Sequence, residues 1–80
     1  MAVTLVFIGK LADRAGEGQR EVPAPLAWAD LPALLGSELA SVIANERTRI
    51  AVNGELLADK TGLAASDGDE VAFLPPVSGG

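Results

Sequence analysis

The residue types that most often carry out catalysis are scarce in this chain of 80 residues. It contains no histidine, no cysteine and no tyrosine, so the usual pairs of a nucleophile and a general base cannot be assembled. Ser66, Ser78 and Lys10 have no evident partner in the sequence that would activate them, and such residues mostly lie on protein surfaces. The sequence therefore predicts no catalytic side chain.

Two glycine-containing segments and one acidic segment have a composition found in ligand-binding loops. Gly16-Glu17-Gly18 lacks the third glycine of a dinucleotide fingerprint, and Gly9-Lys10 lacks the upstream glycine of a phosphate loop. The loop that contains Asp67, Asp69 and Glu70 is much shorter than a calcium-binding EF-hand loop and has no terminal Glu at the required distance. We interpret the glycine segments as turns, and we expect this chain itself to bind no metal and no cofactor.

The C-terminal residues carry the clearest chemical feature. Gly79 and Gly80 have no Cβ, so a bare backbone that ends in a carboxylate can enter a narrow channel. The segment from Pro75 to Gly80 reaches roughly 20 Å when extended, and Pro75 and Pro76 stiffen its start. Delivery of a reactive carboxylate into a partner protein is one interpretation of this tail. An ordinary frayed terminus is the other.

Short segments, punctuated by glycine and proline, must position this tail. Apolar residues at spacings of three and four between Ala29 and Ala44 predict one amphipathic helix, with Asp30 as its N-cap. Gly36 weakens this helix internally. Asn53-Gly54 predicts a hairpin turn between two strands. The predicted strands are residues 2–8, 19–22, 49–53, 55–58 and 70–74, of which the first two form a hairpin. This order of elements describes a single α+β domain.

The alternation of residues along the strands indicates a surface for protein contacts. If the odd-numbered residues of the first strand face the core, Val6 and Ile8 must lie on the opposite face of the sheet. On the last strand the same reasoning leaves Leu74 outward, beside the tail. Together with Leu56 these residues form a predicted apolar patch, which is typical of a protein interface. Coverage by the domain's own loops is the alternative.

The charge balance of the chain limits its partners. Six Lys and Arg against eleven Asp and Glu give a formal net charge of -5, which is opposite to the charge that binding to a phosphate backbone needs. We therefore expect no nucleic-acid partner and favour a basic protein groove, toward which Asp69 and Glu70 at the base of the tail would steer it. The apolar run Val3–Ile8 is too short to cross a membrane, and no basic segment precedes it as in a signal peptide. We expect a cytoplasmic protein that contacts no membrane.

The C-terminal sequence resembles that of a known family. Residues 67–80, DGDEVAFLPPVSGG, are similar to the ending of the small subunit of molybdopterin synthase, and residues 3–16 and 52–55 resemble the same family. The likeness covers most of the chain. It implies a ubiquitin-like β-grasp fold, in which a mixed sheet packs on one main helix. It also implies a β-grasp domain of residues 1–76 and a flexible tail of residues 77–80.

The same resemblance implies a sulfur carrier without catalytic side chains of its own. An activating enzyme would use ATP to adenylate Gly80, a sulfur donor protein would supply the sulfur that displaces AMP, and the resulting C-terminal thiocarboxylate would then donate its sulfur. The large subunit of molybdopterin synthase, in an expected heterotetramer, would receive the tail through a channel that requires Gly79. There the sulfur would be placed on cyclic pyranopterin monophosphate, which forms the dithiolene of molybdopterin.

The surface residues beside the reactive end complete this hypothesis. Those expected to bind the partner proteins are Val6, Ile8, Leu56, Asp69, Glu70, Leu74, Pro75, Pro76, Val77 and Ser78. Two alternatives stay open. One is a sulfur carrier for thiamine, cysteine or tRNA thiolation, and the other is a ubiquitin-like binding module whose tail is never activated.

Overall fold

The computed structural model describes residues 1–75. Its strands are β1 (Ala2–Phe7), β2 (Gln19–Pro23), β3 (Leu26–Ala27), β4 (Arg49–Val52), β5 (Glu55–Leu56), β6 (Ala64–Ala65) and β7 (Glu70–Leu74). Its helices are α1 (Lys10–Ala15), α2 (Leu31–Leu35) and α3 (Ser37–Ala44), with 3₁₀ turns at Trp28–Asp30 and Lys60–Gly62. Within residues 1–75, no helix has the length and apolar character needed to cross a membrane.

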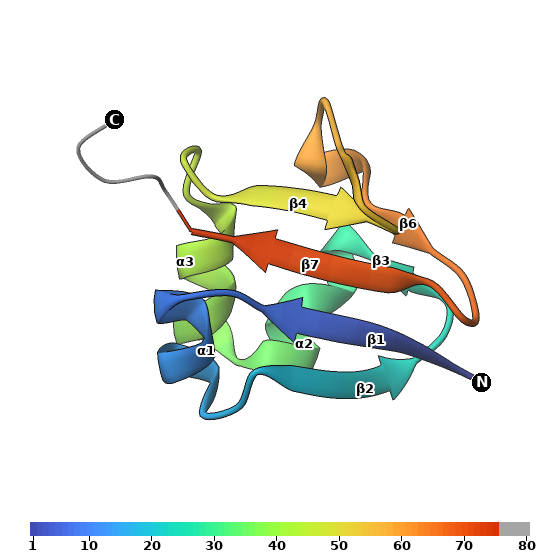
Figure 1. Ribbon diagram of the computed structural model, residues 1–80, viewed down its shortest axis with the longest axis horizontal. Coiled ribbons are helices and arrows are strands. Elements are labelled where there is room, and N and C mark those ends of the chain that lie inside the picture. Colours follow the sequence, from blue (N-terminus) through green and yellow to red (C-terminus); the bar gives the residue numbers. More distant parts are fainter. Residues whose placement is uncertain (76–80) are drawn as a thin grey trace.

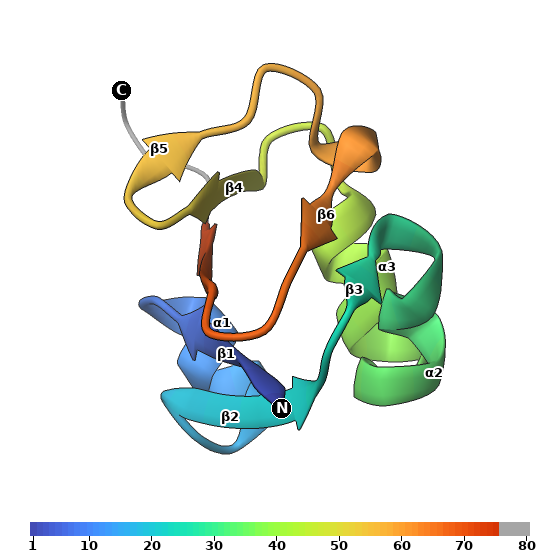
Figure 2. The ribbon, with the colours of Figure 1, turned by 90° about the vertical axis from the view of Figure 1, so that its right-hand side faces the viewer.

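The strands form a mixed sheet with the order β2-β1-β7-β4-β5. β1 and β7 are parallel neighbours, whereas the other neighbours in this sheet are antiparallel. A separate short ladder pairs β3 with β6. The helices lie on one side of the large sheet (Figures 1 and 2). This is the α+β architecture that the sequence predicted, with the mixed sheet of the ubiquitin-like β-grasp fold that the family resemblance implied.

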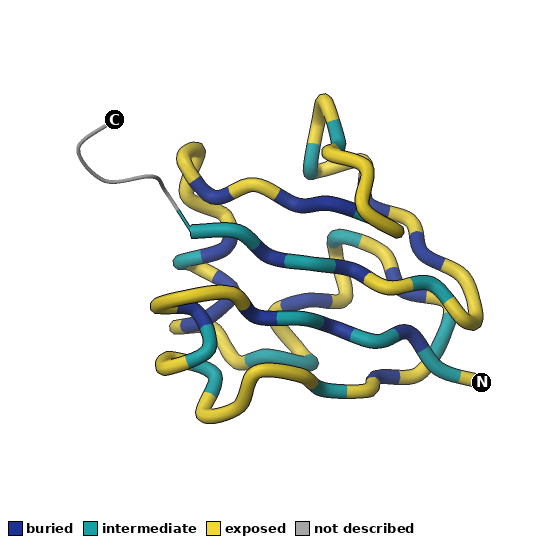
Figure 3. Tube along the Cα trace, in the orientation of Figure 1, coloured by how far each residue is buried: buried dark blue, intermediate teal, exposed yellow. Residues whose placement is uncertain are grey.

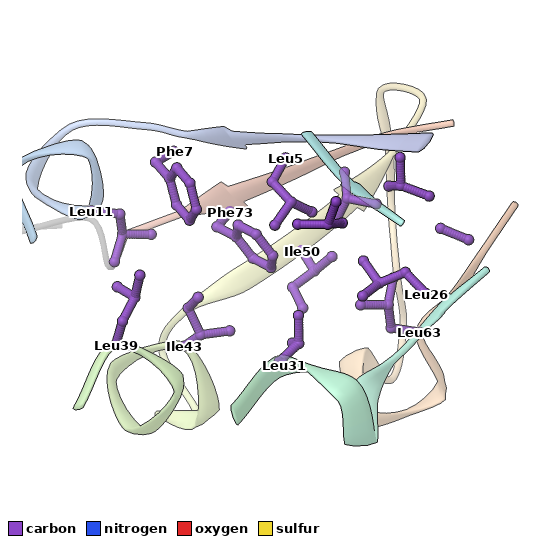
Figure 4. Packing of buried hydrophobic residues seen from close by; sticks show 14 residues of the cluster. Leu5, Phe7, Leu11, Leu26, Leu31, Leu39, Ile43, Ile50, Leu63 and Phe73 are labelled. Carbon is purple, nitrogen blue, oxygen red and sulfur yellow. The ribbon is translucent and has the colours of Figure 1, made fainter. Parts of the chain in front are cut away.

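The hydrophobic core lies between the sheet and the helices. Buried residues alternate with less buried ones along β1 and β7 (Figure 3), as the period of two in a strand requires. Phe7 and Phe73 are register partners, and their stacked rings have centroids 5.4 Å apart. Leu11 from α1 and Ile43 from α3 pack beneath these strands (Figure 4). The prediction that the odd-numbered residues of β1 and β7 face the core is therefore confirmed.

The helix predicted over residues 29–44 is wrong in its continuity. Gly36 separates α2 from α3 because its backbone has φ 89° and ψ 154°, a conformation that residues with a Cβ adopt only with strain. The apolar spacing continues across the break, since both helices still direct leucines into the core. The carboxylate of Asp30 does not act as the predicted N-cap. It accepts a hydrogen bond from the Ala27 N–H at 2.9 Å, across the preceding 3₁₀ turn.

A helix that the sequence pattern did not predict connects the first two strands. α1 begins after Gly9 and ends before Gly16, which has φ 80° and whose N–H donates to the carbonyl of Ala12 at 2.9 Å. β1 and β2 pair antiparallel as predicted, but a helix and not only a turn joins them. α1 therefore begins where β1 ends, beside the C-terminal end of the parallel strand β7.

Lys60 fastens the loop after β5 to the end of α3. Its ammonium donates to the carbonyls of Ile43 at 2.9 Å and Thr48 at 2.8 Å, and also to that of Asn45. A cation at this place also complements the negative end of the helix dipole. Burial lowers the pKa of Lys60, and the charge of Glu46 opposes this shift. The strand predicted over residues 55–58 ends two residues early, and the chain then turns toward this contact.

Candidate tail-presenting site

The strand that leads to the tail is held on both sides. β7 pairs in parallel with β1 and antiparallel with β4. The Ile8 N–H, just beyond β1, also donates to the carbonyl of Phe73 at 3.2 Å. Two flanking strands therefore fix the direction of the chain as it reaches Leu74 (Figure 1). A tail that leaves this strand starts from a rigid base.

Gly9 lies against the base of the tail. It has φ 60°, and a Cβ added to it would lie 3.3 Å from Cγ of Pro75. Both the backbone conformation and the short distance favour glycine here. The sequence predicts a turn at Gly9, but its contact with Pro75 follows from the parallel register of β1 and β7, which no local pattern reveals.

An apolar row crosses the outer face of the sheet, the side away from the helices. The register places Val6 beside Ala72, Ala72 beside Ala51, and Ala51 beside Leu56, so these side chains share one face. Leu56 is 57% exposed, and Ile8, which follows β1, is 40% exposed. The register thus aligns residues from β1, β7, β4 and β5 on one face. Of this row the sequence predicted Val6 and Leu56, whereas Ala72 and Ala51 follow from the strand pairing.

Leu74 also lies on the outer face, at the end of β7 nearest the tail, and like Val6 it is half-buried. We call Val6, Ile8, Leu56 and Leu74 the outer patch. Its exposed part is apolar and adjoins the start of the tail. The role of these residues in partner binding stays a prediction.

Asp69 and Glu70 do not lie at the base of the tail, where the sequence placed them. They lie at the opposite end of β7 from Leu74 (Figure 1), a separation of about 13 Å for a strand of this length. The Asp69 carboxylate accepts hydrogen bonds from the Ser66 N–H at 2.8 Å and the Asn53 side-chain amide at 3.1 Å. These bonds lower the pKa of Asp69, with the Ser66 bond contributing most. The carboxylate of Asp69 therefore closes the turn that precedes β7.

Two cations that the sequence did not single out for binding flank the base of the tail. Arg49 is the register partner of Leu74, and Lys10 directly follows Gly9. Both residues are exposed. Their position depends on the pairing of β7 with β1 and β4, so only the sheet topology makes them neighbours.

The predicted roles of Pro76, Val77, Ser78, Gly79 and Gly80 fall outside the described residues. The predicted boundary between the domain of residues 1–76 and the tail of residues 77–80 lies there too. Among residues 1–75, no group of three or more His, Cys, Asp or Glu side chains is placed to hold a metal ion.

A mixed five-stranded sheet with its helices packed on one face is the architecture of a small ubiquitin-like protein. The chain belongs to the ThiS family, whose sequence model matches residues 5–80. It is accordingly a small sulfur carrier or ubiquitin-like modifier. This family is broader than the single subunit type that the C-terminal sequence resembles.

Solved structures of similar proteins cover the whole chain. SAMP1 from Haloferax volcanii is 30% identical with a TM-score of 0.76, and the alignment covers 100% of both chains. A complex of subunits 1 and 2 of molybdopterin-converting factor from Helicobacter pylori 26695 contains a chain that is 28% identical with a TM-score of 0.66, also with 100% of both chains covered. The HVO 2177 protein of Haloferax volcanii is 25% identical with a TM-score of 0.76, over 100% of this chain and 87% of its own. No curated protein was found to match the chain.

Proposed function

We propose that this chain is a sulfur carrier that serves as the small subunit of molybdopterin synthase. The observation that carries the proposal is the outer patch beside a rigidly held β7, from which the sequence continues to Gly79-Gly80. The similarity to a chain of the Helicobacter pylori molybdopterin-converting factor, seen there in a complex of two subunits, supports the choice of pathway. The run from Phe73 to Ser78, which resembles the same subunit, supports it further.

The chemistry proceeds at the C-terminal carboxylate of Gly80. This carboxylate attacks the α-phosphate of ATP on an activating enzyme, and pyrophosphate leaves. Hydrosulfide, supplied free or released by a donor protein, then attacks the acyl carbon, AMP leaves, and a thiocarboxylate remains. A free carboxylate is a poor acyl donor, whereas an acyl-adenylate has a good leaving group. The nucleotide and the general acids and bases belong to the partner proteins, because the chain has no histidine or cysteine.

The fold presents this carboxylate to the partner proteins. The outer patch docks on the large subunit, and burial of apolar surface supplies binding energy. Docking directs the segment that begins at Pro75 into the large subunit, where an extended tail of this length reaches roughly 20 Å inward. Gly79 passes where a Cβ would not fit, and the thiocarboxylate meets cyclic pyranopterin monophosphate at the end of the channel.

A reconstitution experiment tests the proposal in two stages. The purified chain is incubated with ATP, sulfide and the activating enzyme of the same organism, and its intact mass is measured. We expect the mass gain that corresponds to exchange of one oxygen for sulfur, located on Gly80. The product is then mixed with the large subunit and cyclic pyranopterin monophosphate, and molybdopterin formation is followed.

The matched control is the chain without Gly80, which should keep its melting temperature and form no thiocarboxylate. Failure of the wild-type chain to gain sulfur would overturn the carrier function. Formation of the thiocarboxylate without transfer to the pterin would instead exclude the molybdopterin pathway. The acceptors of thiamine, cysteine and tRNA thiolation would then be tested with the same thiocarboxylate.

A second candidate is covalent modification of other proteins. It is favoured by the similarity to SAMP1, a small archaeal modifier protein, at 30% identity and a TM-score of 0.76. In this case a lysine amine of a target attacks the activated carbonyl of Gly80, AMP leaves, and an amide bond forms. Adducts of higher mass that require both ATP and Gly80, and that persist under reducing and denaturing conditions, would distinguish this function from sulfur transfer.

A further inference from the structure

The positive charges of this acidic chain are unevenly distributed. The sequence contains six Lys and Arg, and the side chains of two of them donate hydrogen bonds within the fold. Arg20 donates to Glu17 at 2.6 Å and to two backbone carbonyls, while Lys60 donates to the backbone at the end of α3. The other four cations are exposed, and they are Lys10, Arg14, Arg47 and Arg49. Of these, Arg14 forms an ion pair with Glu38 at 3.9 Å.

Two of these exposed cations border the point where the tail begins. Arg49 opposes Leu74 across the β4–β7 ladder, so its side chain shares the outer face with the outer patch. Lys10 follows Gly9, the residue that lies against Pro75. Within residues 1–75, the side chains of Lys10 and Arg49 make no hydrogen bond or ion pair with the rest of the fold. Their charges are therefore available to a partner.

The carboxylates near β7 gather at the other end of the sheet. Asp67 accepts a hydrogen bond from the Ala2 N–H at 2.8 Å, and Asp69 and Glu70 follow it in sequence. The start of β7 is thus acidic, and its end is flanked by cations, although the net charge of the chain is -5. The sequence predicts a basic groove in the partner protein because it places carboxylates at the base of the tail. The structure places cations there.

We propose that the activating enzyme receives the tail through an opening whose rim carries carboxylates facing Lys10 and Arg49. This inference rests on the proposed carrier function, because only an activated tail requires such an enzyme. The cations do not serve the nucleotide, since an extended tail carries Gly80 far beyond their reach. Opposite charges at the rim of an interface orient the encounter and raise the association rate. Lys10 and Arg49 thus orient the domain so that the tail points into the channel of the activating enzyme.

The test compares two double variants of equal net charge. Lys10→Gln with Arg49→Gln removes both cations from the base of the tail. Ala33→Glu with Ser41→Glu lowers the net charge by the same amount at exposed positions on α2 and α3, away from the outer face. Adenylation of Gly80 is measured at increasing concentration of each variant with the activating enzyme and ATP, at low and at high salt.

We expect the glutamine variant to raise the KM for the chain about fivefold at low salt, since rim pairs contribute modestly, and to leave kcat unchanged. The glutamate control should behave as the wild type. High salt should raise the wild-type KM and reduce the difference, because screening weakens exposed pairs. An equal KM for both double variants would overturn the inference while wild-type adenylation still supports the carrier function. Absence of adenylation in the wild type would overturn the carrier function itself, and this inference with it.

Discussion

Adjacent leucines after the Asn-Gly turn allow binding and folding to be separated. Leu56 is 57% exposed on the outer face, whereas the half-buried Leu57 packs against the core. We predict that Leu56→Ala weakens binding to the large subunit of molybdopterin synthase and leaves folding nearly unchanged. Leu57→Ala should do the reverse, because its side chain faces the interior. The two substitutions remove the same atoms one residue apart.

The magnitudes follow from exposure. Full burial of a leucine side chain is worth about 1.5–3 kcal/mol, so covering the 57% of Leu56 that is exposed contributes roughly 1–1.5 kcal/mol to docking. Leu56→Ala should therefore raise Kd about five- to tenfold. Leucine-to-alanine changes in fully packed cores cost about 2–5 kcal/mol. Because Leu57 is only half-buried, Leu57→Ala should lower the free energy of unfolding by roughly 1–2 kcal/mol.

Calorimetric titration with the large subunit gives Kd for each variant, and urea unfolding gives the free energy of unfolding. The Leu57 N–H donates to the carbonyl of Ile50 at 2.9 Å, and this backbone bond survives either substitution. An unchanged Kd for Leu56→Ala would refute the assignment of the outer patch. A loss of stability in Leu56→Ala equal to that in Leu57→Ala would refute the assignment of the two faces.

Three further predictions concern the tail and two turns. Gly79→Ala adds one methyl group and should slow adenylation or sulfur transfer at unchanged melting temperature. The rates of the two steps, measured separately, would show which partner protein has the narrow channel. Wild-type rates in both steps would show that neither channel excludes a Cβ at this position. Lys60→Met leaves the carbonyls of Ile43 in α3 and Thr48 before β4 without this donor. It should lower the free energy of unfolding by about 2 kcal/mol, as urea unfolding would measure. The pKa of Asp69 is lowered from 3.8, mainly by the Ser66 N–H, so its stabilisation is present above about pH 4 and is lost as the pH falls through the lowered value. Asp69→Asn should therefore melt below the wild type at neutral pH and approach it in acid, and a constant difference in melting temperature from pH 7 to pH 2 would contradict this.

The strands that carry the site were the most predictable part of the fold. β7 has the residues 70–74 that the sequence predicted, because apolar alternation is bounded by a turn on one side and prolines on the other. Asn53 and Gly54 both have positive φ, at 52° and 84°, as a tight hairpin turn requires. These features are local, so a single sequence is sufficient to reveal them.

Features that depend on long-range pairing could not be predicted in this way. β3 and β6 have two residues each and exist because Leu26 pairs with Ala65. The apolar period of the helices runs through Gly36, so periodicity alone does not reveal the break. The sequence alone predicts the wrong sign of charge around the tail, because Asp69 is near the tail in sequence, whereas Arg49 is near it in space.

The place of β7 in the sheet explains how a terminal group can be reactive without weakening the fold. A strand at a sheet edge frays readily, but β7 is bonded to β1 and β4 along its length. Its inward residues Val71 and Phe73 are fully buried, so the core anchors the strand as far as Leu74. The sequence after Leu74 can then match the channel of a partner protein, because the free energy of unfolding depends on the residues that precede it. The same parallel register places Gly9 and Lys10 beside the exit, so the pairing that holds the tail's base also provides the surface that a partner would read.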